Sequence, residues 1–188
     1  RRYGFHGTSH KYVYQRAVEM LGTDIKDLKI ITCLLGKGAS VTAVKNGKVI
    51  DTSMGLTPLE GLIMGTRCGD IDPAIIPFMM RKEGLDADGV DNLMNKQSGV
   101  YGMTGIASDF RDIEAAAAKG DQKAIDALDA YHTRVNKYIG SYAAEMNGVD
   151  AIVFTAGLGE NGIDNRMAIA SNMEYLGVKM DAEANNVR

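Results

Sequence analysis

Short apolar runs, separated by glycine, asparagine and charged residues, predict the strands of this chain. Residues 29–35 form one such run, and residues 40–45 and 48–52 form two more on either side of Asn46-Gly47. An Asn-Gly pair between two strand-like runs is typical of a tight hairpin. Residues 151–155 form a further run, which we expect to be a short buried strand.

Apolar positions that recur at intervals of three and four residues predict the helices. The longest helix is expected between Asp121 and Gly148, with one apolar stripe made of Ile125, Leu128, Tyr131, Val135, Tyr138, Ile139, Tyr142 and Met146. We expect this stripe to pack on a sheet. Shorter helices are expected over residues 11–21, with Thr8 or Ser9 as cap and Gly22 as stop; over residues 72–82, opened by Asp72-Pro73 and ended by Gly84; after residues 107–111, closed by Gly120; and over residues 164–175. Hairpins together with crossover helices indicate an α/β domain with a mixed sheet flanked by helices.

The composition narrows the class of protein. The chain has 188 residues, of which 45% are hydrophobic, and this size suits a single domain. Its net charge of -3 argues against nucleic acid as a partner, because nucleic-acid-binding proteins carry a clustered basic excess. No apolar run is long enough to cross a bilayer, so we expect a soluble, cytoplasmic protein. Both cysteines are expected to be reduced, and Cys33 to be a small buried hydrophobic residue.

Glycine-rich segments give the first indication of a ligand. Residues 36–38, 65–69 and 157–162 each contain at least two glycines, and the last segment lies between a predicted strand and a predicted helix. Glycine lets backbone N–H groups approach phosphate oxygens, because no Cβ stands in the way. The pattern therefore indicates phosphate binding, although the Walker sequence Gly-x-x-x-x-Gly-Lys-Ser/Thr is absent.

A second class of function is compatible with one of these segments. Residues 157–162 match Gly-x-Gly-x-x-Gly, and a possible further strand ends at Asp181. This spacing fits a dinucleotide fingerprint, so an NAD-binding domain of an oxidoreductase stays a rival hypothesis. It explains only the last part of the chain.

Basic and imidazole side chains supply the candidate chemistry. Arg67 lies between Gly65 and Gly69 and could bind a carboxylate or phosphate, or it could simply pair with Asp70. His6 and His10 stand four residues apart, but no third ligand of matching spacing follows, so we predict no metal site. His132 is expected to be a packed or surface histidine on the long helix.

The opening residues 1–10, RRYGFHGTSH, closely resemble a signature of the acetate and butyrate kinase family. The resemblance continues in family order through residues 51–61, 65–67, 69–73 and 154–161. It implies the fold shared by acetate and sugar kinases, heat-shock ATPases and actin, in which ATP and magnesium lie between two related domains. Residues 1–188 would be the C-terminal nucleotide-binding domain, without the N-terminal domain and the extreme C-terminus.

The resemblance also implies an activity and a set of site residues. The family transfers the γ-phosphoryl group of ATP reversibly to acetate, giving acetyl phosphate and ADP. His6 and Arg67 would be catalytic, and the nucleotide would bind to Leu35, Gly36, Gly38, Asp109, Phe110, Arg111, Gly157, Leu158, Gly159, Glu160 and Asn161. Magnesium ligands are expected mainly outside this chain, which by itself is expected to be inactive. The family implies a homodimer, so a non-catalytic dimerisation module with a tyrosine-rich helix as interface is a third hypothesis.

One segment departs from the family pattern. The family's phosphate loop usually reads His-Leu-Gly-Asn-Gly, whereas this chain has Leu34 and Lys37 in place of the histidine and the asparagine. Leu34 offers no hydrogen bond to a phosphate. Lys37 could supply a compensating positive charge or could disturb magnesium binding.

Overall fold

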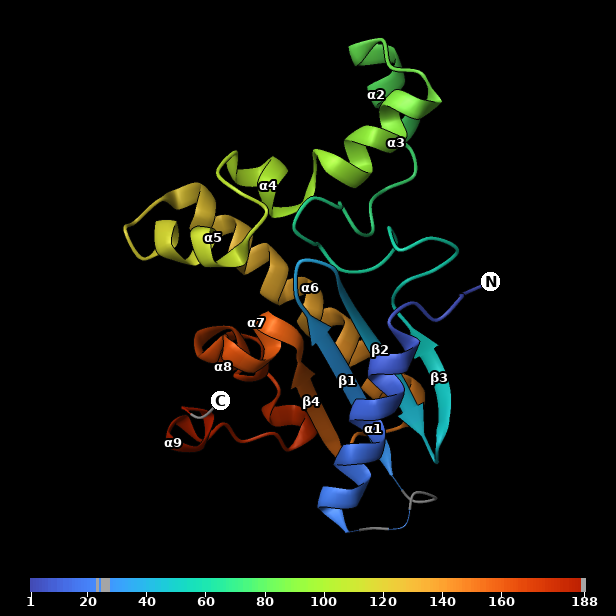
Figure 1. The fold of residues 1–188 in the computed structure, drawn as a ribbon, viewed down its shortest axis with the longest axis vertical. Helices are drawn as coiled ribbons and strands as arrows, with labels where there is room; N and C mark the ends of the chain where they lie inside the picture. The colour runs from blue at the N-terminus through green and yellow to red at the C-terminus, as the bar shows by residue number, and fades with distance from the viewer. Residues whose placement is uncertain (23, 25–27, 187–188) are drawn as a thin grey trace.

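The computed structural model describes residues 1–22, 24 and 28–186. Within these residues, a four-stranded sheet forms the centre, in the order β3-β2-β1-β4 (Figure 1). The strands are β1 (Lys29–Leu35), β2 (Ala39–Lys45), β3 (Lys48–Thr52) and β4 (Ala151–Thr155). β1 pairs antiparallel with β2 and parallel with β4, so the predicted mixed sheet is confirmed. The Asn46-Gly47 hairpin is also confirmed, with both residues at positive φ.

Helices cover both faces of this sheet. α6 (Gln122–Met146) packs on one face and α1 (Gly7–Leu21) on the other (Figure 1). Because side chains alternate along a strand, Ile31, Cys33 and Leu35 of β1 join the larger core beneath α6, whereas Ile30 joins a smaller core with Tyr14 of α1. The predicted α/β class, with a sheet flanked by helices, is therefore confirmed.

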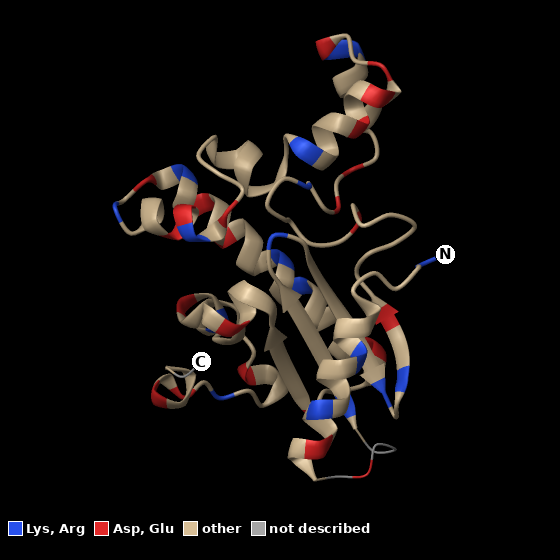
Figure 2. Ribbon diagram, viewed as in Figure 1, with Lys and Arg blue, Asp and Glu red and all other residues tan. Residues whose placement is uncertain are grey.

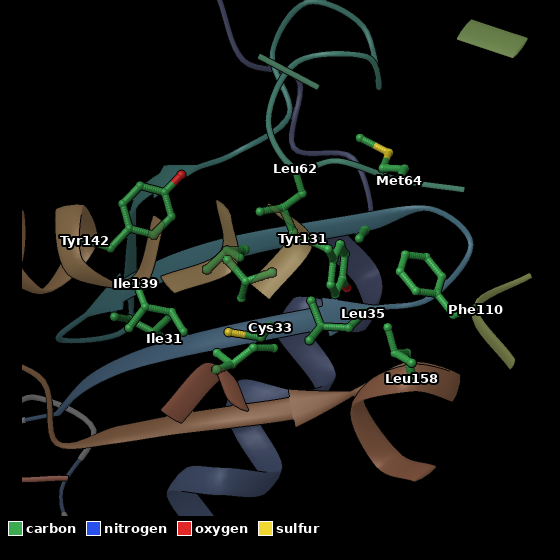
Figure 3. Packing of buried hydrophobic residues seen from close by; sticks show 14 of the residues in the cluster. Ile31, Cys33, Leu35, Leu62, Met64, Phe110, Tyr131, Ile139, Tyr142 and Leu158 are labelled. Carbon is green, nitrogen blue, oxygen red and sulfur yellow. The ribbon is translucent and has the colours of Figure 1, made fainter. Parts of the chain in front are cut away.

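The long helix buries the stripe that its periodicity predicts. Its buried side chains are Ala124, Ala127, Tyr131, Val135, Ile139, Tyr142, Ala143 and Met146, while Ile125, Leu128 and Tyr138 are only partly buried. Tyr131 and Tyr142 pack with Ile31, Cys33 and Leu35 in the core (Figure 3). These two tyrosines are buried inside the domain, so they offer no exposed surface for the dimer interface of the third hypothesis. Burial raises the pKa of the Cys33 thiol, as expected for an inert core cysteine.

The remaining helices differ in their position relative to the sheet. α2 and α3 project away from the sheet, whereas α5, α7 and α8 lie near the ends of β1 and β4 (Figure 1). Their bounds are α2 (Ile75–Glu83), α3 (Ala87–Lys96), α4 (Gly99–Thr104), α5 (Phe110–Ala117), α7 (Ala156–Asn161), α8 (Ile163–Ala170), the 3₁₀ helix η2 (Glu174–Leu176) and α9 (Ala182–Asn185). α3 and α4 were not predicted from the sequence.

Two predicted helix starts are wrong. α1 begins at Gly7 rather than at residue 11, because His6 adopts a left-handed conformation with φ of 60° and its carbonyl accepts the N–H of His10. Thr8 and Ser9 therefore lie inside the helix and do not cap it. Asp72 accepts the N–H of Ala74, but α2 begins only at Ile75.

The C-terminal part also differs from the prediction. The helix expected over residues 164–175 ends at Ala170, and η2 follows it separately. The strand expected to end at Asp181 does not form; instead the Asp181 carboxylate caps α9 through the N–H groups of Glu183 and Ala184. The second strand that a dinucleotide-binding unit requires is thus missing from the described residues.

Positions of both charges are distributed along the described part of the chain. Figure 2 shows Lys and Arg positions interspersed with Asp and Glu positions along the helices and loops, with the inner strands largely uncharged. No helix among the described residues is long and apolar enough to span a membrane.

Tyr131 provides a test of the core. Its hydroxyl is fully buried and has no hydrogen-bond partner among the described residues, and such a group destabilises the folded state. We predict that Tyr131→Phe raises the free energy of unfolding by about 1 kcal/mol in urea denaturation. Tyr138→Phe is the matched control: the Tyr138 hydroxyl donates to Asp70 at 2.6 Å, so this variant should lose stability. A loss of stability in both variants would contradict this account.

Candidate functional site

The candidate site lies at one edge of the sheet. β1 and β4 are parallel neighbours, so their carboxyl ends lie side by side. β1 leads into the loop Gly36-Lys37-Gly38, and β4 leads at once into α7. A Cβ at Gly36 would lie 3.7 Å from the Cβ of Ala156, which places the two segments in contact. Ligands of open α/β sheets bind at this kind of position.

A cavity of about 560 Å³ opens between these segments and α5. It is lined by Gly36, Lys37, Ser108, Asp109, Phe110, Arg111, Glu114, Gly157, Leu158, Asn161 and Gly162. Its size is in the range of small-molecule and cofactor sites. Three segments far apart in the sequence therefore form one pocket.

The start of α5 forms one wall of this cavity. Asp109 caps the helix by accepting the N–H of Arg111 at 3.0 Å, and the guanidinium of Arg111 pairs with the same carboxylate at 2.6 Å. These hydrogen bonds from Arg111 lower the pKa of Asp109 to about 2. Phe110 points the other way and packs on Tyr131, with ring centroids 4.7 Å apart. Phe110 and Leu158 lie near Leu35 at the end of β1 (Figure 3).

The opposite wall is a helix where the sequence predicts a glycine turn. Residues 156–161 form α7, so the expected loop at 157–162 is wrong. Ala156 makes the turn out of β4 with φ of 65°, and the carboxylate of Glu160 accepts both its N–H and the hydroxyl of Thr155, each at 3.1 Å. A carboxylate one turn into a helix satisfies N–H groups that otherwise lack partners. This contact allows a glycine-rich segment to be helical.

The predicted nucleotide contacts divide into two groups. Gly36, Asp109, Phe110, Arg111, Gly157, Leu158 and Asn161 all line the cavity. The others lie beside it: Leu35 is fully buried under the end of β1, Gly159 is buried in α7, Glu160 bonds to the β4 junction, and Gly38 faces a separate group of side chains.

The second glycine segment completes this region. The N–H of Gly65 donates to the carbonyl of Lys37 at 3.0 Å, which joins the two loops. A Cβ at Gly38 would lie 3.6 Å from Nη1 of Arg67 and 3.7 Å from Nε2 of His6. The two predicted catalytic side chains therefore converge over Gly38.

Arg67 does not make the simple surface pair that the sequence left open. Asp70 instead accepts a hydrogen bond from Tyr138 and lies 3.9 Å from Arg134. The guanidinium of Arg67 contacts the sulfur of Met64 at 3.9 Å. Its guanidinium therefore has no carboxylate partner among the described residues.

His6 and His10 have different surroundings. His6 is partly buried and its Nδ1 lies 2.8 Å from the hydroxyl of Ser40. His10 is buried, with Nδ1 2.7 Å from Thr32 Oγ1 and Nε2 2.7 Å from Ser40 Oγ. Burial, and secondarily the charge of Arg67, lower the pKa of His6, and burial lowers that of His10 to about 4. His132 donates from Nε2 to Oδ1 of Asn165 at 2.7 Å, as expected for a packed histidine.

Some side chains in this region were missed in the sequence. Ser108 and Glu114 line the cavity, one before the α5 cap and the other one turn after Phe110. Thr32 and Ser40 contact His10 from inside predicted buried strands. Polar residues in otherwise apolar strands need partners when buried, and this rule could have pointed to both.

Comparison with known proteins places the chain in a family. A model of the acetokinase family matches residues 1–188. The chain belongs to this family. It is 74% identical over its whole length to the acetate kinase of Clostridioides difficile (strain 630), of which it covers 47%, and 63% identical to that of Alkaliphilus metalliredigens (strain QYMF), of which it covers 48%. The chain thus spans about half the length of these relatives.

Solved structures agree with this assignment. The crystal structure of Porphyromonas gingivalis acetate kinase superimposes with a TM-score of 0.97 at 51% identity, over 99% of this chain and 47% of the other. A propionate kinase from Francisella tularensis superimposes with a TM-score of 0.93 at 45% identity, over 98% of this chain and 47% of the other. The fold is therefore that of the acetokinase family.

The two residues that depart from the family pattern, Leu34 and Lys37, have different positions in this acetokinase domain. Leu34 is buried within β1, where its side chain contributes to packing. Lys37 is exposed at the loop tip and lines the cavity, near enough to Asp109 to lower the pKa of that carboxyl. Lys37 therefore brings a positive charge to the cavity wall.

The buried His10 predicts a pH dependence of stability. Its pKa is about 4 when folded and 6.5 without the fold, so below pH 6.5 the unfolded chain binds a proton that the folded chain does not. The contribution of neutral His10 to the free energy of unfolding should be fully present above pH 6.5. It should decrease between pH 6.5 and pH 4, by on the order of 3 kcal/mol. Urea denaturation at several pH values measures this fall. The variant His10→Gln should lose this part of the dependence, and an unchanged slope would contradict the assignment.

Proposed function

We propose that this chain is the C-terminal, nucleotide-binding half of an acetate kinase. In the complete enzyme, ATP would phosphorylate the carboxylate of acetate to give acetyl phosphate and ADP, and the reverse reaction would make ATP. The proposal is supported by family membership over residues 1–188 and by relatives named acetate kinase that are about twice as long. The other half of the active site would come from the part of the relatives that this chain does not span.

One observation carries the proposal: the loop after β1 lines the cavity with Gly36 and Lys37, and its next residue, Gly38, lies beside His6 and Arg67. We infer that adenosine lies between α5 and α7 and that the phosphates follow the loop after β1. The terminal phosphoryl group would then lie over Gly38, within reach of Arg67 Nη1 and His6 Nε2. Gly38 suits this position, since the absence of a side chain leaves the space between these donors open.

The chemistry of phosphoryl transfer fits these side chains. Negative charge spreads over the equatorial oxygens in the transition state, so fixed donors around them supply much of the catalysis. Arg67 has no carboxylate partner among the described residues that would compete with an anion. His6 carries a lowered pKa and would act as a neutral donor beside that charge.

Magnesium would accompany the nucleotide and would neutralise charge on its phosphates. Among the described residues, no three His, Cys, Asp or Glu side chains form a group that could hold a metal ion. We propose that the nucleotide and the other half of the enzyme supply its ligands. No step of the chemistry assigned to this chain passes through the metal.

The remaining features of the proposal rest on the family. Acetate is proposed as substrate because the most similar relatives named here are acetate kinases, although a propionate kinase shares the fold. A cytoplasmic homodimer is proposed, for which Ile75 and Phe78 of α2 offer exposed apolar side chains at 43% and 52% exposure. The NAD-binding alternative is not supported, because the described residues lack its second strand and the matched family consists of kinases.

Nucleotide binding tests the proposal directly. We predict that isothermal titration calorimetry detects binding of ADP with magnesium and no binding of NAD. Gly157→Leu should abolish the ADP signal, because a Cβ at this cavity-lining position meets no atom within 4 Å and the longer side chain would fill the cavity without straining the fold.

Ala118→Leu is the matched control, because it adds the same side chain at an exposed position after α5. It should bind ADP like the native chain. The proposal fails if NAD binds in place of ADP, or if Gly157→Leu binds ADP as the native chain does.

Lys37 should contribute a charge to phosphate binding. We predict that Lys37→Met weakens ADP binding roughly fivefold to tenfold, about 1 kcal/mol, and that the difference shrinks at high salt. The same titrations at low and high ionic strength measure it. Tighter binding by the variant would indicate instead that Lys37 disturbs the magnesium-nucleotide complex.

A further inference from the structure

Hydroxyl and imidazole groups alternate between the interior of the sheet and His6. Thr32 Oγ1 lies 2.7 Å from Nδ1 of His10, Nε2 of His10 lies 2.7 Å from Ser40 Oγ, and Ser40 Oγ lies 2.8 Å from Nδ1 of His6. Thr32 and Ser40 are fully buried, and His10 is 4% exposed. The elements that bring them together are β1, β2 and α1, on the face of the sheet opposite α6.

The number of available protons restricts this row of bonds to two arrangements. The hydroxyl of Ser40 has one proton and can donate to only one of the two imidazoles, so the other must donate to it. A neutral imidazole likewise donates through one nitrogen and accepts through the other. When all three hydrogen bonds are formed, there are two possibilities. Either Thr32 donates to His10, His10 to Ser40 and Ser40 to His6, or each of these bonds has the opposite donor.

The Thr32 end decides between them. Besides His10, the hydroxyl of Thr32 has one other hydrogen-bond neighbour among the described residues, the carbonyl of Thr42 at 3.5 Å. This carbonyl can only accept, and the distance lies at the limit of a hydrogen bond. If His10 donated to Thr32, the buried Thr32 proton would be left with this contact alone. Buried donors without partners are rarer and costlier than acceptors with spare capacity. The hydroxyl of Thr32 therefore donates to His10 at 2.7 Å.

The direction fixes the proton at the far end. His10 then donates from Nε2 to Ser40, and Ser40 donates to Nδ1 of His6. The single proton of neutral His6 is left on Nε2, the atom that faces the space over Gly38 together with Arg67. We propose that Thr32, His10 and Ser40 are positioning residues that hold His6 as its Nε2–H tautomer, so that an uncharged imidazole donates to the terminal phosphoryl group. Only the last step, the identity of the acceptor, rests on the proposed function.

This arrangement resolves a conflict at His6. Burial and the nearby guanidinium of Arg67 disfavour the imidazolium form, as the lowered pKa indicates. A neutral imidazole with its lone pair on Nε2 would repel an anion. The relay, by which we mean the hydrogen-bonded row Thr32–His10–Ser40–His6, excludes that form. Arg67 then provides the charge and His6 provides a directed donor.

The tautomer can be observed directly. The sequence contains three histidines, so long-range ¹H–¹⁵N correlation spectra of the ¹⁵N-histidine-labelled chain can be assigned with His132→Gln and His10→Gln variants. At neutral pH we expect a protonated, pyrrole-like Nε2 and a pyridine-like Nδ1 for both His6 and His10. The opposite pattern at His6, with the proton on Nδ1, would overturn the proposal.

Ser40→Ala gives an independent test through the sign of a pKa change. A hydrogen bond donated by Ser40 to Nδ1 opposes protonation of His6 at that atom, so its removal should raise the pKa of His6 by about 0.5 to 1. If His6 donated to Ser40, the bond would favour the charged form and its removal would lower the pKa. The other titrating or charged groups that act on His6, namely Arg67 and His10, are unchanged in this variant.

Ser53→Ala is the matched control, because its buried hydroxyl accepts the N–H of Val41 and lies outside the relay. This variant should leave the pKa of His6 unchanged, and a lowered or unchanged pKa in Ser40→Ala refutes the relay. All these spectra are recorded without nucleotide. Failure of ADP to bind would therefore count against the proposed function alone, and a wrong tautomer against the relay alone.

Discussion

The parallel pairing of β1 with β4 is the constraint on which the candidate site depends. The two strands are separated by more than a hundred residues of sequence, yet their register aligns Leu34 with Thr155 at the carboxyl edge. The segments that follow β1 and β4 must then lie next to each other at this edge of the sheet. The loop after β1 and the helix after β4 consequently face each other, and α5 closes the gap between them. A pocket at this position is a result of sheet topology, and the glycines adapt the backbone to it.

The two faces of the sheet take different tasks because side chains alternate along each strand. On the α6 face, β1 contributes Ile31, Cys33 and Leu35 to a continuous apolar core. On the α1 face, Thr32 and Ser40 interrupt the apolar pattern and meet His10. β1 and β2 thus each contribute apolar side chains to the main core and one hydroxyl, Thr32 or Ser40, to the opposite face. A register slip of one residue would exchange the two sets and destroy both.

The sequence predicted the framework better than the details of the site. Strands and the long helix follow from strong periodic patterns and from Asn46-Gly47, and these signals are local. α7 was missed because its glycines indicate a loop, whereas in the structure the strand-end turn at Ala156 is held by the carboxylate of Glu160, four residues later, and the segment is helical. The convergence of His6 and Arg67 depends on contacts between loops and strands distant in sequence, so it was accessible only through the resemblance to a family. The roles assigned to the individual nucleotide-binding residues stay predictions.

The wall of the cavity is also the outer surface of the main core. Phe110 stacks on Tyr131 inside the protein, while Asp109 and Arg111 beside it face the cavity. Leu158 is in the same position on the other side, because Gly157 beside it is exposed while its own side chain belongs to the core. A molecule bound here would therefore rest on groups that come apart only when the whole domain unfolds. Binding of a molecule in this cavity would therefore raise the melting temperature of the entire domain, and would not merely order a surface loop.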